Sequence, residues 1–344
     1  MKDFDRQREL ANCTFVKTML MLIVVFYHSI LCWSGDWFPA ISVQRFEILA
    51  TIASWLNSFH IYGFTLVSGY LFYYLRYEKG KYGQYVPFLK QKAKRLLVPY
   101  VFAAAVWVIP ISAIFFPELM SNIYVYILGT APAQLWFLLM LFGVFLLFWP
   151  LSDFLKERQM FGAVVMIGFY GVGVAGQVVL PDVYQIFRAC MYMPIFWLGF
   201  KLRQWGADWL RRIPSALWLL VHILLFAVSQ YISNIDGMIF TFLRLGFELV
   251  LHIVGALMAF ALLQQIADKV NWKNSKAFRF VSKLSMPVYL FHQQVIYVFL
   301  YCFNGLLNPY IHSAVNFVGA MAVSLALSAL LSKFSVTRFL VGEK

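Results

Sequence analysis

His28 is the residue of this chain whose surroundings point most directly to chemistry. It lies in an apolar run, Phe15–Trp33, eleven residues after Lys17, with no charged residue between the two. If this run is a membrane helix, the rise per residue places the imidazole roughly 16 Å beyond the lysine, about halfway across the hydrocarbon core. An ionisable group at that depth is unfavourable and marks a functional site by default. Because imidazole exchanges protons near neutral pH, His28 could act as a general base or as a nucleophile.

His292 poses the same question in another apolar run, Ser285–Phe303. Two glutamines follow it directly, which makes its neighbourhood more polar than that of His28. No carboxylate is close to His28 in the sequence, so any partner of its ring must come from another helix.

A third set of ionisable residues is spaced for a single helix face. Arg244, Glu248 and His252 are four residues apart and therefore lie one above the other on a helix. A carboxylate between a guanidinium and an imidazole could act as a proton acceptor. Alternatively, the set is a structural ion pair that lets a polar helix enter a bundle. The sequence leaves both interpretations open.

The densest run of positive charge lies at residues 90–95. Lys92 and Arg95 of this run fall on one side of a helical turn, where basic side chains could bind phosphate groups. The alternative is that they only mark the cytoplasmic end of a membrane helix.

The elements that must position these residues are membrane helices. Of the 344 residues, 62% are apolar and only 12% charged, whereas about a quarter of the residues of a soluble domain are charged. Apolar runs of spanning length predict an all-α, polytopic integral membrane protein with about ten transmembrane helices. The expected spans are Phe15–Trp33, Ile48–Leu75, Leu96–Phe116, Leu135–Pro150, Met160–Leu180, Tyr184–Phe200, Ala216–Ser233, Thr241–Ile266, Ser285–Phe303 and Ser313–Leu331.

The distribution of basic residues supports ten spans with both termini in the cytoplasm. In that orientation all 28 Lys and Arg except Arg45, Arg188 and Arg244 fall in cytoplasmic segments. The net charge of +13 then reports topology and contact with anionic membrane lipid, and a share of it could serve an anionic substrate. We expect no nucleic-acid partner, because no basic soluble module is apparent. We expect one membrane domain over residues 1–344, with no appended soluble domain.

A glycine-rich motif at residues 171–176 has the spacing of a dinucleotide-binding fingerprint. Gly171, Gly173 and Gly176 carry it, but such a motif requires a preceding strand and a soluble helix. Here it lies inside an apolar span, so we interpret it as a place where two helices approach closely.

Five segments occur in an order typical of one family. They are Lys17 with His28, Phe64–Leu71 with its Ser-Gly-Tyr sequence, Lys92–Tyr100, Leu135–Leu138 with its Trp-Phe pair, and Ser282–Gln293. Through these segments the chain resembles the acyltransferase-3 family of bacterial inner-membrane proteins, near its surface-polysaccharide and fucose O-acetylase branches. It departs from the family pattern at Lys92, where paired arginines are usual, and at Thr14, where an acidic residue is common.

The resemblance implies transfer of an acetyl or other short acyl group from acyl-CoA to a hydroxyl of a cell-envelope sugar. O-antigen, capsule and exopolysaccharide, free or lipid-linked, are the implied acceptors. The implied setting is the bacterial inner (cytoplasmic) membrane, with acetyl-CoA as the donor substrate and no metal. The expected catalytic residues are His28, His292 and Glu248, and the expected donor-binding residues are Lys17, Lys92, Arg95 and Arg244. A transporter of acyl groups, glycolipid or polysaccharide precursor, which forms no ester, is the alternative.

Overall fold

The computed structural model describes residues 2–35, 37, 41–118 and 123–343, and this part of the chain is helical with no strand. The predicted all-α, polytopic membrane fold is confirmed, because eight helical segments within these residues are long and apolar enough to span a bilayer. The eight segments are Arg6–Ser34, Tyr85–Phe115, Tyr124–Glu157, Gln159–Val179, Ser215–Ser233, Leu243–Lys269, Ser285–Phe303 and Pro309–Leu331.

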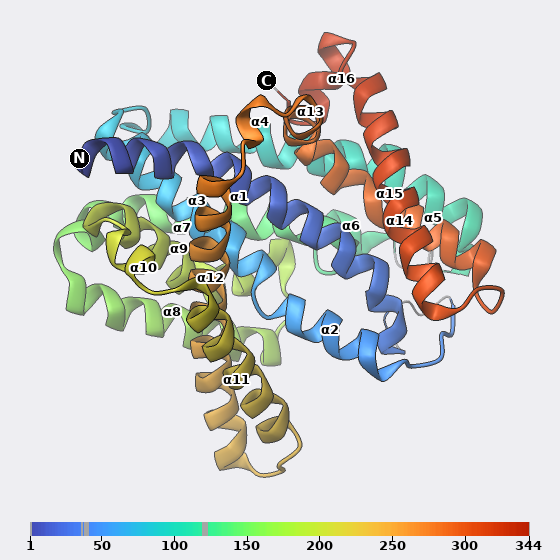
Figure 1. The fold of residues 1–344 in the computed structure, drawn as a ribbon, viewed down its shortest axis with the longest axis horizontal. Coiled ribbons are helices and arrows are strands. Elements are labelled where there is room, and N and C mark those ends of the chain that lie inside the picture. Colours follow the sequence, from blue (N-terminus) through green and yellow to red (C-terminus); the bar gives the residue numbers. More distant parts are fainter. Residues whose placement is uncertain (1, 36, 38–40, 119–122, 344) are drawn as a thin grey trace. The chain divides into compact units, whose positions relative to one another are not determined.

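Figure 1 shows the α-helices of the described residues in chain order. In order they are α1 (Lys2–Leu31), α2 (Glu47–Asn57), α3 (His60–Tyr73), α4 (Tyr85–Ala103), α5 (Ile109–Phe115), α6 (Tyr124–Leu128), α7 (Trp136–Glu157), α8 (Gln159–Val179), α9 (Ile186–Trp205), α10 (Asp208–Arg212), α11 (Ser215–Ser233), α12 (Met238–Lys269), α13 (Lys276–Lys283), α14 (Ser285–Phe303), α15 (Pro309–Leu331) and α16 (Ser335–Leu340).

The second and sixth expected spans are not among the eight. The second is divided into α2 and α3 at Ser58 and Phe59, where the Ser58 hydroxyl donates a 2.6 Å hydrogen bond to the carbonyl of Trp55. Such side-chain bonds to the backbone compete with helical hydrogen bonding. The sixth corresponds to α9, which is continuous but carries three basic residues, Arg188, Lys201 and Arg203, so that every stretch of spanning length within it contains all three.

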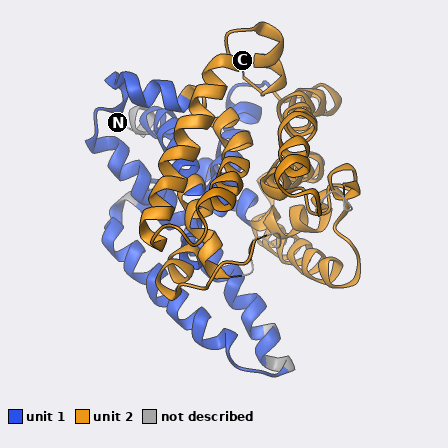
Figure 2. Cartoon of the chain, turned by 90° about the vertical axis from the view of Figure 1, so that its right-hand side faces the viewer, with its two compact units in different colours: residues 1–24, 54–81, 195–282 blue, residues 25–53, 82–194, 283–344 orange. Residues whose placement is uncertain are grey.

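The chain forms two compact units, coloured separately in Figure 2. Unit 1 contains Met1–Val24, Ser54–Lys81 and Ile195–Ser282, and unit 2 contains Val25–Ala53, Tyr82–Pro194 and Lys283–Lys344. The helices α1 and α9 each continue from one unit into the other.

Unit 1 is held together by a close crossing of α3 with the second half of α9. A Cβ atom added at Gly69 would lie 1.9 Å from the carbonyl oxygen of Phe196, and one added at Gly199 would lie 1.9 Å from that of Leu66. Only glycine permits this backbone contact. The glycine of the Ser-Gly-Tyr segment is therefore a packing residue.

Unit 2 contains a second close crossing, between α8 and the first half of α9. A Cβ atom at Gly173 would lie 2.6 Å from the carbonyl oxygen of Phe187, and one at Gly176 only 2.1 Å from its ring, whereas Gly171 has open space around it. The interpretation of this motif as helix packing is confirmed. In the same unit α14 packs along α15 and against α4, which in turn packs on α7.

Candidate active site

The structure brings two of the predicted residues together in unit 2. Nδ1 of His28, in the last turn of α1, lies 3.1 Å from Nε2 of His292 in α14. His292 is fully buried, whereas His28 is partly exposed. We call these two residues the histidine pair. The partner that His28 requires from another helix is thus a second histidine, 264 residues further along the chain.

The hydrogen bonds of His292 determine which nitrogen of each ring carries the proton. Its Nδ1 lies 2.8 Å from the carbonyl oxygen of Tyr289 and 3.2 Å from that of Val288. Because carbonyl oxygens only accept, Nδ1 of His292 is the protonated nitrogen, and Nε2 of the neutral ring is an acceptor. His28 then donates through Nδ1–H, and its own lone pair resides on Nε2. That atom is the base of the pair.

A buried glutamine holds α14 in place around His292. Gln134 lies in the helical turn η5 (Ala133–Leu135), and its Nε2 donates to the carbonyl of Leu290 at 2.8 Å and to Oε1 of Gln294 at 2.6 Å. The hydroxyl of Tyr289 donates to the carbonyl of Gln134. These bonds satisfy polar groups that are otherwise unfavourable in an apolar interior, and they fix the helix that carries His292.

Two further contacts surround the histidine pair. The indole of Trp107, in the π-helical turn η3 (Ala104–Val108), donates a 3.0 Å hydrogen bond to the carbonyl of Phe291. The ring of Trp37 is close to both His28 and Tyr297, with centroid distances of 6.0 Å and 5.0 Å. Aromatic rings therefore lie beside His28, the partly exposed member of the pair.

Lys92 of α4 lies in a cage of aromatic rings in the same unit. Its ammonium is 3.9 Å from the ring centroid of Phe145, 4.8 Å from that of Tyr82 and 5.4 Å from that of Phe88. Cation–π contacts of this kind hold the charge in one place. Arg95, one turn later, is exposed. The structure thus gives the two basic residues of this motif different surroundings.

The remaining predicted residues belong to unit 1. Lys17 is half-buried on α1, and Arg244 and Glu248 are half-buried on α12, where they interact electrostatically. His252 stacks flat on Tyr62, with centroids 3.8 Å apart and planes inclined by 13°. The proposed roles of these residues stay predictions.

A buried polar network in unit 1 was not foreseen from the sequence. Arg203 of α9 forms two hydrogen bonds, of 2.7 Å and 2.6 Å, with the carboxylate of Glu78 in the turn η2 (Tyr74–Glu78). Its guanidinium also donates to the hydroxyl of Tyr70 at 2.9 Å, and that hydroxyl donates to Glu9 at 2.6 Å. The tyrosine of the Ser-Gly-Tyr segment was the only signal. The Arg203 pairing connects residues 125 positions apart.

Gln134 was also missed, although it directly precedes the Trp-Phe pair at the start of an apolar span. Within the described residues, no three His, Cys, Asp or Glu side chains are grouped so that they could hold a metal ion.

Comparison with known proteins gives one match. The model of a family described as an acyltransferase domain matches residues 11–333, nearly the whole chain, and this range includes both members of the histidine pair. No curated protein and no solved structure is detectably similar to the chain.

Proposed function

The chain belongs to the acyltransferase-3 family, and we propose from this premise that it transfers an acetyl group from acetyl-CoA to a hydroxyl of a cell-envelope sugar. Membrane acyltransferase activity follows from the family and from the membrane-spanning helices. The donor, the acceptor and a location in the bacterial inner membrane are our proposal. The histidine pair is the observation that carries it.

The proposed reaction uses the lone pair on Nε2 of His28. This nitrogen removes the proton from the acceptor hydroxyl while the oxygen attacks the carbonyl carbon of the thioester. The tetrahedral intermediate then collapses, the carbon–sulfur bond breaks, and the departing thiolate takes the proton back from His28. The products are the acetyl ester and free coenzyme A, and the histidine returns to its starting state.

His292 orients the base and stabilises its charged form. Its Nε2 accepts the Nδ1–H of His28 at 3.1 Å, which selects the productive tautomer and fixes the plane of the ring. When His28 becomes an imidazolium, the same hydrogen bond becomes charge-assisted and therefore stronger. A carboxylate plays this part in serine hydrolases. Here a neutral imidazole does so, held by the carbonyl of Tyr289.

The donor is expected to approach from the cytoplasm, where coenzyme A is acylated. Its phosphates are strongly anionic, and the basic segment that precedes the third expected span suits them. Arg95 is exposed and can reach a soluble ligand, whereas Lys92 supplies a charge held by aromatic rings. Lys17 and Arg244 remain proposed donor ligands, and Glu248 remains a proposed supporting residue.

Mass spectrometry of envelope glycans tests the proposal in the native organism. The strains compared are the wild type, a deletion strain, and deletion strains producing His28→Ala or Phe26→Leu. Phe26 precedes His28 by two residues and is 39% exposed, so its substitution serves as the matched control. We expect the acetyl ester to be absent from the deletion and His28→Ala strains and present in the other two.

The proposal is wrong if His28→Ala protein, shown to be folded and inserted, supports full acetylation. The transporter alternative is separated by a second measurement. Purified protein should consume labelled acetyl-CoA and form an ester, whereas a transporter moves solute without forming one.

A further inference from the structure

An arginine in the first turn of α9 has no part in the proposed reaction. Arg188 is half-buried in unit 2, and it is one of the three Lys and Arg that lie outside the predicted cytoplasmic segments. It forms none of the ion pairs found among the described residues. A guanidinium inside a membrane protein is unfavourable without a counter-charge, and it marks a functional site by default.

The carboxylate closest to Arg188 in the sequence is occupied by other donors. Oδ1 of Asp182 accepts from the backbone N–H of Phe187 at 2.8 Å, and Oδ2 accepts from the backbone N–H of Arg188 at 3.0 Å. Oδ2 also accepts from Nε2 of Gln177 at 3.1 Å. The N–H groups of a first helical turn have no partner within the helix, so these bonds fix the start of α9. They hold the backbone of Arg188 and leave its guanidinium outside the ion pair.

The guanidinium lies instead against the indole of Trp136, the first residue of α7. Its Cζ is 4.6 Å from the ring centroid, within the range of a cation–π contact. Tyr192, one turn after Arg188 on the same face of α9, has its ring centroid 6.0 Å from that of Trp136. Trp136 is half-buried, as Arg188 is, so both side chains are partly accessible. We call Arg188 and Trp136 the arginine–tryptophan pair.

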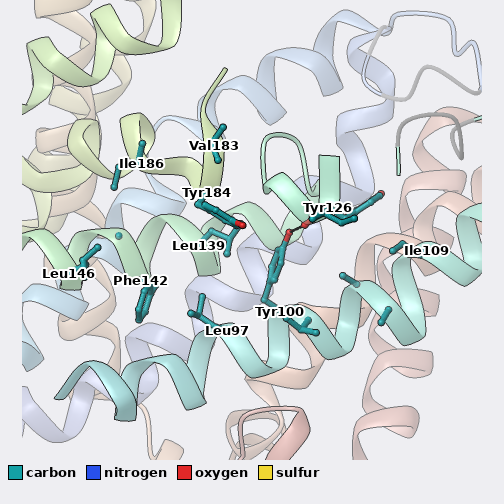
Figure 3. A pocket seen from close by; sticks show the side chains of 15 residues that line it. Leu97, Tyr100, Ile109, Tyr126, Leu139, Phe142, Leu146, Val183, Tyr184 and Ile186 are labelled. Carbon is teal, nitrogen blue, oxygen red and sulfur yellow. Dashed lines mark hydrogen bonds between the residues drawn. The ribbon is translucent and has the colours of Figure 1, made fainter. Parts of the chain in front are cut away.

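The helix directs Arg188 away from the apolar part of unit 2. Ile186 lines an apolar cavity of about 830 Å³, and Figure 3 shows its side chain there together with those of Leu139 and Tyr184. Residues two positions apart point to roughly opposite sides of a helix, and Arg188 is not among the residues that line the cavity. The arginine–tryptophan pair is therefore a separate feature of unit 2.

Packed side chains of unit 2 connect this pair with the histidine pair. The ring of Trp136 is 6.1 Å from that of Phe137, which is 6.1 Å from that of Tyr289. The ring of Tyr289 in turn lies 6.0 Å from that of His292. The hydroxyl of Tyr289 also donates to the carbonyl of Gln134, two residues before Trp136. The start of α7 is thus held against the helix that carries His292.

We propose that the arginine–tryptophan pair binds the acceptor, and that the acceptor is an acidic sugar whose carboxylate or phosphate pairs with Arg188. The inference rests on the proposed function, because it names the substrate class of the same reaction. A guanidinium binds either anion through two parallel hydrogen bonds, and the apolar indole of Trp136 suits the C–H groups of a sugar ring. The anion of the ligand supplies the counter-charge of Arg188. A neutral sugar lacks this ion pair and binds more weakly.

Acceptor kinetics of the purified full-length protein test the inference. The acceptor is envelope glycan from the deletion strain, used untreated, after reduction of its carboxyl groups with carbodiimide and borohydride, and after removal of phosphate with hydrofluoric acid. The variants are Arg188→Gln and Arg188→Lys, with melting temperatures that show each to be folded. Arg45→Gln is the matched control, because Arg45 also lies outside the predicted cytoplasmic segments but is exposed and paired with Glu47.

We expect KM for the untreated glycan to rise roughly 10- to 100-fold in Arg188→Gln, the affinity that hydrogen bonds to a charged group contribute. Arg188→Lys keeps the charge but loses the paired hydrogen bonds, so its KM should rise less. Arg45→Gln should match the wild type, and KM for acetyl-CoA should be unchanged in all three variants. One of the two treatments of the glycan should raise KM of the wild type to that of Arg188→Gln, which identifies the anion.

Three results overturn the inference. The first is an unchanged KM for the glycan in Arg188→Gln. The second is a raised KM for acetyl-CoA, because Arg188 then binds the donor. The third is wild-type protein that uses both treated glycans as well as the untreated one, and this result requires no variant to fold.

Binding of fluorescently labelled glycan is measured separately, with and without Arg188→Gln, so that the two proposals can fail independently. Binding that depends on Arg188 and persists in His28→Ala while transfer is lost supports both. Binding that depends on Arg188 without any ester formation by the wild type contradicts the proposed function alone. Ester formation with a KM and a binding affinity that do not depend on Arg188 contradicts the acidic acceptor alone.

Discussion

Replacing His292 by glutamine and by asparagine tests whether His28 is the base and whether His292 acts by accepting its hydrogen bond. Glutamine can place an oxygen near the position of Nε2, where it accepts the Nδ1–H of His28. Asparagine reaches only the position of Nδ1, where it keeps the hydrogen bond to the carbonyl of Tyr289 and leaves His28 without its acceptor. The two variants therefore separate the two hydrogen bonds that His292 makes.

The magnitude follows from the hydrogen bond that is lost. The bond from Nδ1–H of His28 to His292 becomes charge-assisted when His28 is protonated to an imidazolium. Hydrogen bonds to charged groups contribute about 1.5–3 kcal/mol. At about 1.4 kcal/mol for each factor of ten in rate, His292→Asn should lower kcat roughly 10- to 100-fold. His292→Gln should stay within about threefold of the wild type, because its bond differs mainly in geometry. KM for acetyl-CoA should be unchanged in both, since neither variant touches the proposed donor-binding residues.

The assay is release of free coenzyme A by purified protein, with a His28→Ala reference and with melting temperatures that show each variant to be folded. His28→Ala should lose roughly 100- to 10,000-fold, the usual contribution of a general base. The reasoning is refuted if glutamine and asparagine variants have equal rates. It is also refuted if His292→Gln is as inactive as His28→Ala, because His292 would then be the base itself.

Three further predictions concern packing, buried charge and pH. Gly173→Ala should destabilise the protein by about 1–3 kcal/mol, because its Cβ meets backbone at 2.6 Å, whereas Gly171→Ala should be neutral or stabilising; unfolding midpoints in detergent distinguish the two. Arg203→Met should lower the free energy of unfolding by about 3 kcal/mol, because the carboxylate of Glu78 loses its ion-pair partner. The double variant with Glu78→Leu should recover most of that stability. Burial raises the pKa of Tyr82 above its usual value of 10, so the unfolded chain loses this proton first and stability falls as the pH rises through 10. The slope of unfolding free energy against pH should be smaller in Tyr82→Phe.

The membrane fold could be predicted because each spanning helix is determined locally. A helix in lipid satisfies its own backbone hydrogen bonds, so a long apolar run is sufficient to identify it. Where the expected spans and the structure differ, polar residues are responsible. The hydroxyl of Ser58 competes with the helix at the division between α2 and α3, and three basic residues distinguish α9 from the more apolar α8 and α11.

The candidate site was only partly predictable. His28 and His292 could be singled out because an ionisable group in an apolar run is unfavourable wherever it lies. Nothing in the sequence indicated that the two rings contact each other, or that Gln134 holds the helix that carries His292. The same limit applies to Arg203, whose charge looked like a topology signal until its pairing with Glu78 was seen.

The sequence by itself therefore determined that the chain spans a membrane, that its fold is all-α, and which ionisable residues lie inside apolar runs. These properties depend on composition and on spacing along one helix. Only the tertiary structure decided which of those residues meet, because contacts across hundreds of positions depend on how helices pack. The tautomer of His28 is the clearest case. It follows from the carbonyl of Tyr289 in α14, which accepts a hydrogen bond from Nδ1–H of His292, and no property of the segment around His28 contains that information.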